Sequence, residues 1–230
     1  MGKTVMAVGG HIGDMELTAG PTLAKIVAEG GRAIIVDCTY GERGHPTLPL
    51  AEYRAQKIAE AKAFAERIGA EVVLLDYSDG FLPDDDSVAE QIAQLIRENR
   101  PDLLITHWKG SMHRDHIHAA KAAERGAFLA SIPIDEIETP RYSVPSIWFA
   151  ENWEDADGFS PDTYVAIPDE AFTAWREGIQ HHAYARGETY GFRFIDYYTA
   201  LMTVKGCLIG EQRACAFMSA GTEKFALAGP

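Results

Sequence analysis

The first 130 residues alternate between short apolar runs and longer amphipathic stretches. The apolar runs have the composition of buried β-strands, and they lie at 4–8, 33–38, 72–75 and 103–106. Between them, residues 51–68 and 87–99 place apolar side chains three and four positions apart, which is the spacing of one helix face. This strand–helix alternation predicts a Rossmann-like, doubly wound, mainly parallel α/β sheet.

From about residue 132 the pattern becomes less regular and richer in proline and aromatic residues. The elements that it still indicates are a strand at 164–167 and helices at 169–185 and 194–208. The aromatic residues between 148 and 164 are expected to serve the core or subunit contacts. Because no repeat or long linker interrupts the chain, we expect a single domain over 1–230, with a core at 1–130 and a cover at 131–230.

Composition narrows the classes of partner. An apolar content of 47% in 230 residues is enough for one large core. A net charge of -13 and a pI near 5.0 argue against nucleic acid or an anionic membrane and favour a small molecule. The three cysteines form no close pair, and neither a signal peptide nor a membrane-spanning run is evident, so we expect reduced thiols and a cytoplasmic location.

Polar residues follow the first predicted strand, where a doubly wound sheet binds its ligands. His11 and Asp14 stand three positions apart in a glycine-rich turn, so both side chains can face one ion at the start of a helix. An imidazole nitrogen and a carboxylate oxygen together suit zinc. The same residue types also cap helices, so this segment alone leaves both interpretations open.

A second cluster follows the fourth predicted strand. Four of the eight histidines lie within residues 107–118, a region that includes His113, Asp115 and His116. One interpretation is a polar helix start, with Asp115 as the cap and the histidines in solvent. The group as a whole, opposite the first segment at the same edge of the sheet, favours a metal site.

These two segments resemble the motifs of the PIG-L/LmbE-like N-deacetylase family. Its members carry His-Pro-Asp-Asp-Glu after the first strand and His-Pro-Asp-His after the fourth, with matching spacing. The resemblance extends to the Gly-Glu-Arg-Gly sequence at 41–44, to Arg54 and to residues 76–80, and it covers residues 3 to about 130.

The resemblance implies a Zn²⁺ site with His11, Asp14 and His116 as ligands. It further implies hydrolysis of an N-acyl, typically N-acetyl, amide bond on a small molecule such as an amino sugar conjugate. Members of the family are often homo-oligomers, so we expect one here. The supporting roles that the resemblance implies are proton donation or carbonyl polarisation by His113, orientation of His113 by Asp115, and substrate contact or support at the rim by Arg54 and Asp79. The alternatives for the last two are an exposed helix charge at Arg54 and a turn carboxylate at Asp79.

One position departs from the family motif. The residue before the metal-binding aspartate is Gly13, where the family has the carboxylate that acts as general base. A subset of this fold that lacks this carboxylate includes a zinc-dependent hydratase acting on an unsaturated oxo-acid, and it shares the Gly-Glu-Arg-Gly sequence. Glu42 is therefore a candidate substitute base, or alternatively a turn residue paired with Arg43. The remaining alternatives to the deacetylase are a hydratase or lyase and a non-catalytic small-molecule binder.

Overall fold

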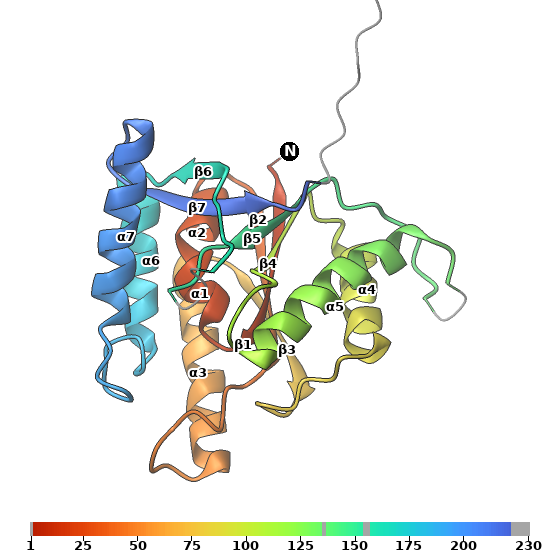
Figure 1. Cartoon of the computed structure of the whole chain (residues 1–230), viewed down its shortest axis with the longest axis horizontal. Helices are drawn as coiled ribbons and strands as arrows, with labels where there is room; N and C mark the ends of the chain where they lie inside the picture. Colours follow the sequence, from red (N-terminus) through yellow and green to blue (C-terminus); the bar gives the residue numbers. More distant parts are fainter. Residues whose placement is uncertain (1, 135–136, 154–156, 222–230) are drawn as a thin grey trace, which may run out of the picture.

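The computed structural model describes residues 2–134, 137–153 and 157–221. Seven strands form one sheet in the order β3-β2-β1-β4-β5-β7-β6, with helices packed on both sides (Figure 1). The strands are β1 (Thr4–His11), β2 (Arg32–Thr39), β3 (Glu71–Tyr77), β4 (Leu103–His107), β5 (Ile147–Ala150), β6 (Thr163–Ala166) and β7 (Ala214–Ser219). The first five strands in this order run parallel, whereas β7 is antiparallel to both β5 and β6. The predicted doubly wound, mainly parallel sheet is confirmed.

The helices divide between the two faces of the sheet. They are α1 (Asp14–Thr18), α2 (Gly20–Ala28), α3 (Leu50–Ile68), α4 (Asp86–Asn99), α5 (Arg114–Ser131), α6 (Asp169–Gly178) and α7 (Phe194–Ile209). Val5 and Ala7 of β1 face a core that α1, α2, α3, α6 and α7 cover. Met6 and Val8 face a second core against α4 and α5. Since side chains alternate along a strand, each buried strand supplies both cores.

The order of strands places a topological switch point between β1 and β4. From β1 the chain proceeds outward to β2 and β3, and then returns to pair β4 with the other edge of β1. The connections after the carboxyl ends of β1 and β4 therefore diverge and leave a crevice, which is where open α/β sheets bind ligands. His11 ends β1 and His107 ends β4, so the two histidine-bearing segments meet at this edge.

One predicted element is wrong in its extent. The predicted helix at 169–185 ends at Gly178 and passes through a short 3-10 turn at Ile179–His181. The backbone N–H of Ala183 then donates to the Glu60 carboxylate at 3.2 Å, so a side chain of α3 replaces the helical carbonyl acceptor. Local turns and this contact with α3 together set the path of residues 182–193, which runs beside the crevice.

In the described part of the chain, no helix is both long and apolar enough to cross a membrane. All three cysteines are unpaired, as expected; Cys38 and Cys215 are buried and Cys207 is exposed.

Candidate active site

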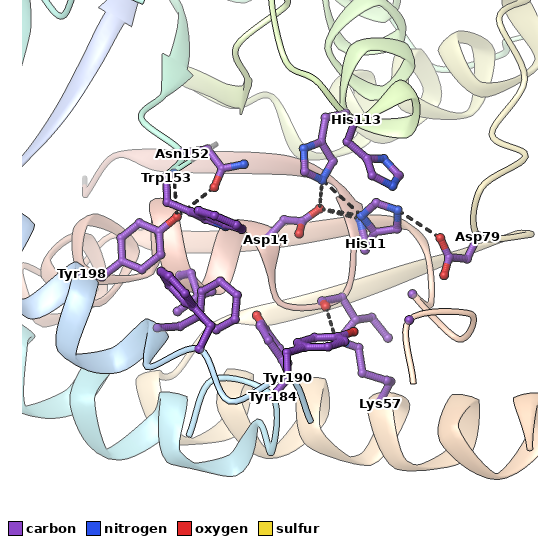
Figure 2. Close-up of a pocket in the computed structure, with 17 residues that line it drawn as sticks. His11, Asp14, Lys57, Asp79, His113, Asn152, Trp153, Tyr184, Tyr190 and Tyr198 are labelled. Atoms are coloured by element: carbon purple, nitrogen blue, oxygen red, sulfur yellow. Dashed lines mark hydrogen bonds and ion pairs between the residues drawn. The ribbon is translucent and has the colours of Figure 1, made fainter. Parts of the chain in front are cut away.

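A cavity of about 380 Å³ opens at the carboxyl edge of β1 (Figure 2). One side, which we call the histidine wall, consists of His11, Asp14, Asp79, His113 and His116. The facing side, which we call the aromatic wall, consists of Trp153, Tyr184, Tyr190, Phe192, Phe194 and Tyr198. Small-molecule sites commonly combine an apolar lining with a few convergent polar groups, and this cavity has both.

The turn after β1 fixes the first two polar side chains of the histidine wall. Gly13 has φ 106°, a left-handed conformation that favours glycine, and it allows α1 to begin at Asp14 directly after the strand. The His11 backbone N–H donates to Asp14 Oδ2 at 2.8 Å, and the Gly13 N–H donates to Glu16 Oε2 at 2.9 Å. These bonds hold Asp14 against His11 and leave Glu16 facing the helix terminus.

Three donor atoms converge at the base of the cavity. His11 Nδ1 lies 3.1 Å from Asp14 Oδ2, His116 Nε2 lies 3.2 Å from the same oxygen, and the two nitrogens are 3.2 Å apart. Ligand atoms of a tetrahedral zinc site with bonds of about 2.0–2.1 Å are about 3.3–3.4 Å apart, so this triangle fits one ion. The structure brings together the three residues that the sequence predicted as ligands.

Other groupings of possible ligands overlap with this one. His11, His113 and His116 lie close enough to share an ion, and so do Asp14, His107 and His116. His107 Nε2, however, accepts the Gly10 N–H at 2.9 Å, which occupies the lone pair that a metal would need. Burial lowers the pKa of His107 to about 4, so the ring is neutral, and it stacks on His116 at 3.9 Å between centroids. His107 therefore holds the His116 ring in place by stacking.

Two carboxylates flank the second nitrogen of the His11 ring. His11 Nε2 lies 3.2 Å from Asp79 Oδ1 and 3.3 Å from Asp115 Oδ2. Metal-binding histidines usually present their second nitrogen to a carboxylate in this way, which fixes the ring and its tautomer. Burial opposes a charge on His11, yet Asp14 and these two carboxylates hold its pKa well above the ordinary value. The third grouping of possible ligands, His11 with Asp79 and Asp115, is this supporting arrangement.

His113 lies beside the triangle and faces the cavity. Its ring centroid is 4.6 Å from that of His11, and its Nδ1 accepts the Asp115 backbone N–H at 3.2 Å. Asp115 therefore orients His113 through the main chain, while its carboxylate accepts the N–H groups of Gly80 and Leu82. Burial lowers the pKa of His113, so at neutral pH the ring is uncharged and its proton resides on Nε2.

Two further predicted site residues lie outside the cavity lining. The carboxylate of Glu42 is buried behind Asp79 and accepts its backbone N–H at 3.2 Å. Arg54 is exposed on α3, pairs with Asp76 and stacks over the Tyr40 ring. Asp79 therefore lines the cavity, whereas Glu42 and Arg54 lie just outside its rim.

The aromatic wall and Lys57 were not predicted as site residues. Trp153, expected in a core or subunit contact, lines the cavity and stacks on Phe192 at 4.8 Å. Lys57 projects from α3, is buried, and donates to the Ile12 carbonyl at the cavity edge (Figure 2). Lys57 could have been noticed from the sequence, because a lysine on the apolar face of an amphipathic helix is unusual. The residues of the aromatic wall could not, because they lie in segments without periodicity.

Sequence comparisons identify related proteins. A family model described as PIG-L, GlcNAc-PI de-N-acetylase, matches residues 6–127. The 1D-myo-inositol 2-acetamido-2-deoxy-alpha-D-glucopyranoside deacetylase of Corynebacterium glutamicum strain R is 27% identical over 221 residues, covering 79% of this chain and 74% of that protein. Deacetylase 1 of the same description from Catenulispora acidiphila is 30% identical over 162 residues, covering 57% of this chain. This chain spans about half the length of the Catenulispora protein, 50% by coverage.

Solved structures with the same fold include two enzymes with different activities. GalB, the 4-carboxy-2-hydroxymuconate hydratase from Pseudomonas putida KT2440, superposes with a TM-score of 0.87 at 20% identity, covering 99% of this chain and 100% of that one. N,N'-diacetylchitobiose deacetylase from Pyrococcus horikoshii superposes with a TM-score of 0.80 at 20% identity, covering 96% and 84%. At this identity the structures establish the fold alone, and it is the family model and the relatives that are described as deacetylases. Because the family match spans more than half of the 230 residues, the chain belongs to the PIG-L family of GlcNAc-PI de-N-acetylases.

Proposed function

We propose that this protein is a zinc-dependent hydrolase that removes an N-acyl group, most simply acetyl, from a small amino sugar conjugate. The observation that carries the proposal is the triangle of His11 Nδ1, Asp14 Oδ2 and His116 Nε2 at the base of the cavity. Two nitrogens and one oxygen are a donor set that zinc accepts in catalytic sites, where three protein ligands leave a position open. The family membership supports the reaction class.

When bound, zinc would supply an activated water and polarise the acyl carbonyl. The protein's own groups would then position the substrate and stabilise the charge that develops on the carbonyl oxygen. The Nε2–H of neutral His113 is available to donate a hydrogen bond to that oxygen, since its Nδ1 is held by the Asp115 N–H. Asp79 and Asp115 would keep His11 oriented throughout.

The aromatic wall would bind the rest of the substrate. Trp153 and Phe192 stack on each other, and Phe192 continues the aromatic surface to Phe194 at 4.5 Å. The Tyr198 hydroxyl donates to Asn152 Oδ1 at 2.9 Å, so polar groups lie among the rings. Rings bordered by hydroxyl and amide groups suit a ligand with an apolar face and several hydroxyls.

Hydration of an unsaturated oxo-acid is the second candidate, favoured by the absence of a carboxylate at Gly13. The same ion and the same His113 would serve this reaction, with Glu42 as the residue that accepts the proton. Glu42 lies behind Asp79, so a role in turnover requires Asp79 or a water to relay the proton. The full-length superposition on a hydratase is compatible with this candidate.

The test compares the two reactions on the same protein. Metal-stripped protein, with and without added zinc, is assayed for acetate release from 1D-myo-inositol 2-acetamido-2-deoxy-alpha-D-glucopyranoside and for hydration of 4-carboxy-2-hydroxymuconate. Zinc-dependent acetate release supports the proposal, and zinc-dependent hydration alone replaces it with the second candidate. Activity in neither assay leaves a small-molecule binder. Glu42→Gln separates the mechanisms further, because only the hydratase should lose most turnover while retaining its zinc.

A further inference from the structure

The Tyr184 hydroxyl stands where a side chain at position 13 would begin. A Cβ built on Gly13 would lie 2.1 Å from the Tyr184 hydroxyl oxygen and 2.6 Å from the ring carbon that bears it. Real Cβ atoms do not approach neighbours so closely. A residue larger than glycine at position 13 would therefore clash with Tyr184 unless the tyrosine moved. The absence of a carboxylate at position 13 is therefore structurally linked to the position of the Tyr184 hydroxyl, which occupies the space that the carboxylate side chain would need.

The ring of Tyr184 is held from several sides. It contacts Phe194 and His182 edge-on, with centroid distances of 5.4 Å and 5.7 Å. Lys57 Nζ lies 4.2 Å from the ring centroid, on a side chain that is itself tied to the Ile12 carbonyl. A group packed in this way keeps its hydroxyl at a fixed point, which is what a site needs from a positioned donor.

Among the residues that the structure describes, none is a hydrogen-bond partner of the hydroxyl itself. Within the described residues, the buried Tyr184 oxygen forms no hydrogen bond, although Tyr184 lines the cavity beside Asp14 (Figure 2). Buried tyrosine hydroxyls normally have a partner, because an unpaired polar group costs free energy. A partner supplied from the cavity satisfies this requirement. Burial raises the pKa of Tyr184 well above its ordinary value, so the group keeps its proton.

We propose that Tyr184 is a catalytic residue whose hydroxyl replaces the side chain missing at Gly13 and donates a hydrogen bond to the substrate oxygen that gains negative charge as water adds. This inference rests on the proposed metal-centred site and names a donor that the family motif does not contain. The bond stabilises the developing charge without transferring the proton. It also restricts the substrate, because only a molecule with an acceptor oxygen opposite Gly13 satisfies the phenol.

The first experiment removes the hydroxyl alone. In zinc-loaded Tyr184→Phe, acetate binding measured by calorimetry should weaken about tenfold or more, the effect of one lost hydrogen bond to a charged group. On the acetamido conjugate, kcat should fall on the order of 100-fold, with a smaller change in KM. Tyr142→Phe is the matched control, because its hydroxyl donates to the Pro101 carbonyl outside the cavity.

The second experiment measures, without any ligand, the steric clash between a side chain at position 13 and Tyr184. Gly13→Ala, Tyr184→Ala and the double variant form a thermodynamic cycle in melting experiments. Gly30→Ala provides the cost of a positive φ alone, since Gly30 has φ 78° and open space at its Cβ. Gly13→Ala should lower the melting temperature more than Gly30→Ala does, and Tyr184→Ala should relieve the excess.

The outcomes separate this inference from the proposed hydrolysis. If wild type releases no acetate from the conjugate but Tyr184→Phe still weakens acetate binding, hydrolysis fails and the role of Tyr184 stands. If Tyr184→Phe matches wild type in acetate affinity and turnover, the inference is overturned. Additive melting changes in the cycle overturn the steric exclusion on which it rests. Failure of zinc-loaded wild type to bind acetate counts against both proposals.

Discussion

The two walls of the cavity differ in where they come from along the chain. The histidine wall follows the carboxyl ends of β1, β3 and β4, all within the residues 6–127 that the family model matches. The aromatic wall comes from residues 153–198, outside that match. The proposed metal site thus lies in the part of the chain that defines the family. The proposed substrate-binding surface lies in the part outside it, and such a division allows one fold to host several reactions.

The largest expected effect is on the histidine wall. His116→Ala removes one of the three donor atoms and should abolish stoichiometric zinc binding. Activity should fall about 1,000-fold or more, since the ion supplies several kcal/mol of transition-state stabilisation. His181→Ala is the matched control, because His181 is exposed and is not among the residues that line the cavity. Full zinc content in His116→Ala, measured by elemental analysis, would show that the histidine wall is not the metal site.

A histidine behind the aromatic wall should behave in the opposite way, affecting stability and not metal content. His182 is buried, with Nε2 3.8 Å from Glu16 and Nδ1 3.7 Å from Glu60. Burial lowers its pKa to about 4, below the unfolded value near 6.5, so the folded protein prefers the neutral ring. Its contribution is therefore present above pH 6.5 and is lost as pH falls toward 4.

The expected size of this loss is on the order of 3 kcal/mol. Denaturant unfolding at several pH values should show a steeper decline in wild type than in His182→Gln. An identical pH dependence in the two proteins would mean that His182 is solvated or already charged in the folded state. Unchanged zinc content in His182→Gln provides the contrast with His116→Ala.

The sequence predicted the histidine wall because its determinants are local. Apolar runs identify β1 and β4, and the parallel sheet brings the ends of these strands together, so His11 and His116 could be assigned to one site. The aromatic wall could not be predicted in the same way. Tyr184 lies in an irregular segment whose path depends on the bond from Ala183 to Glu60 and on packing against Phe194. Neither contact has a periodic signal in the sequence.

The resemblance implied that Asp79 either contacts substrate or supports the site from its rim. The structure places its carboxylate 3.2 Å from His11 Nε2, a position that fits support of a metal ligand. We expect Asp79→Asn to weaken zinc affinity about 10- to 100-fold, the usual cost of losing such a supporting carboxylate. Asp76→Asn, on an exposed side chain paired with Arg54, is the control. A raised KM with unchanged zinc affinity would instead support the original prediction of substrate binding.

A smaller effect is expected on the aromatic wall. Trp153→Ala removes one ring of the stacked pair with Phe192 and should raise KM about tenfold, with zinc content unchanged. Arg54→Ala should change KM less than twofold if its exposed position outside the cavity is correct. An equal effect of the two substitutions on KM would contradict the assignment of substrate binding to the aromatic wall and not to Arg54.

The most direct test of the account is the location of the metal. Crystals grown with zinc, measured with X-rays above and below the zinc absorption edge, reveal the ion by its anomalous difference peak. We expect one strong peak per chain, at bonding distance from His11 Nδ1, Asp14 Oδ2 and His116 Nε2. A peak between Asp79 and Asp115, a peak on His107, or no peak in the cavity would contradict it.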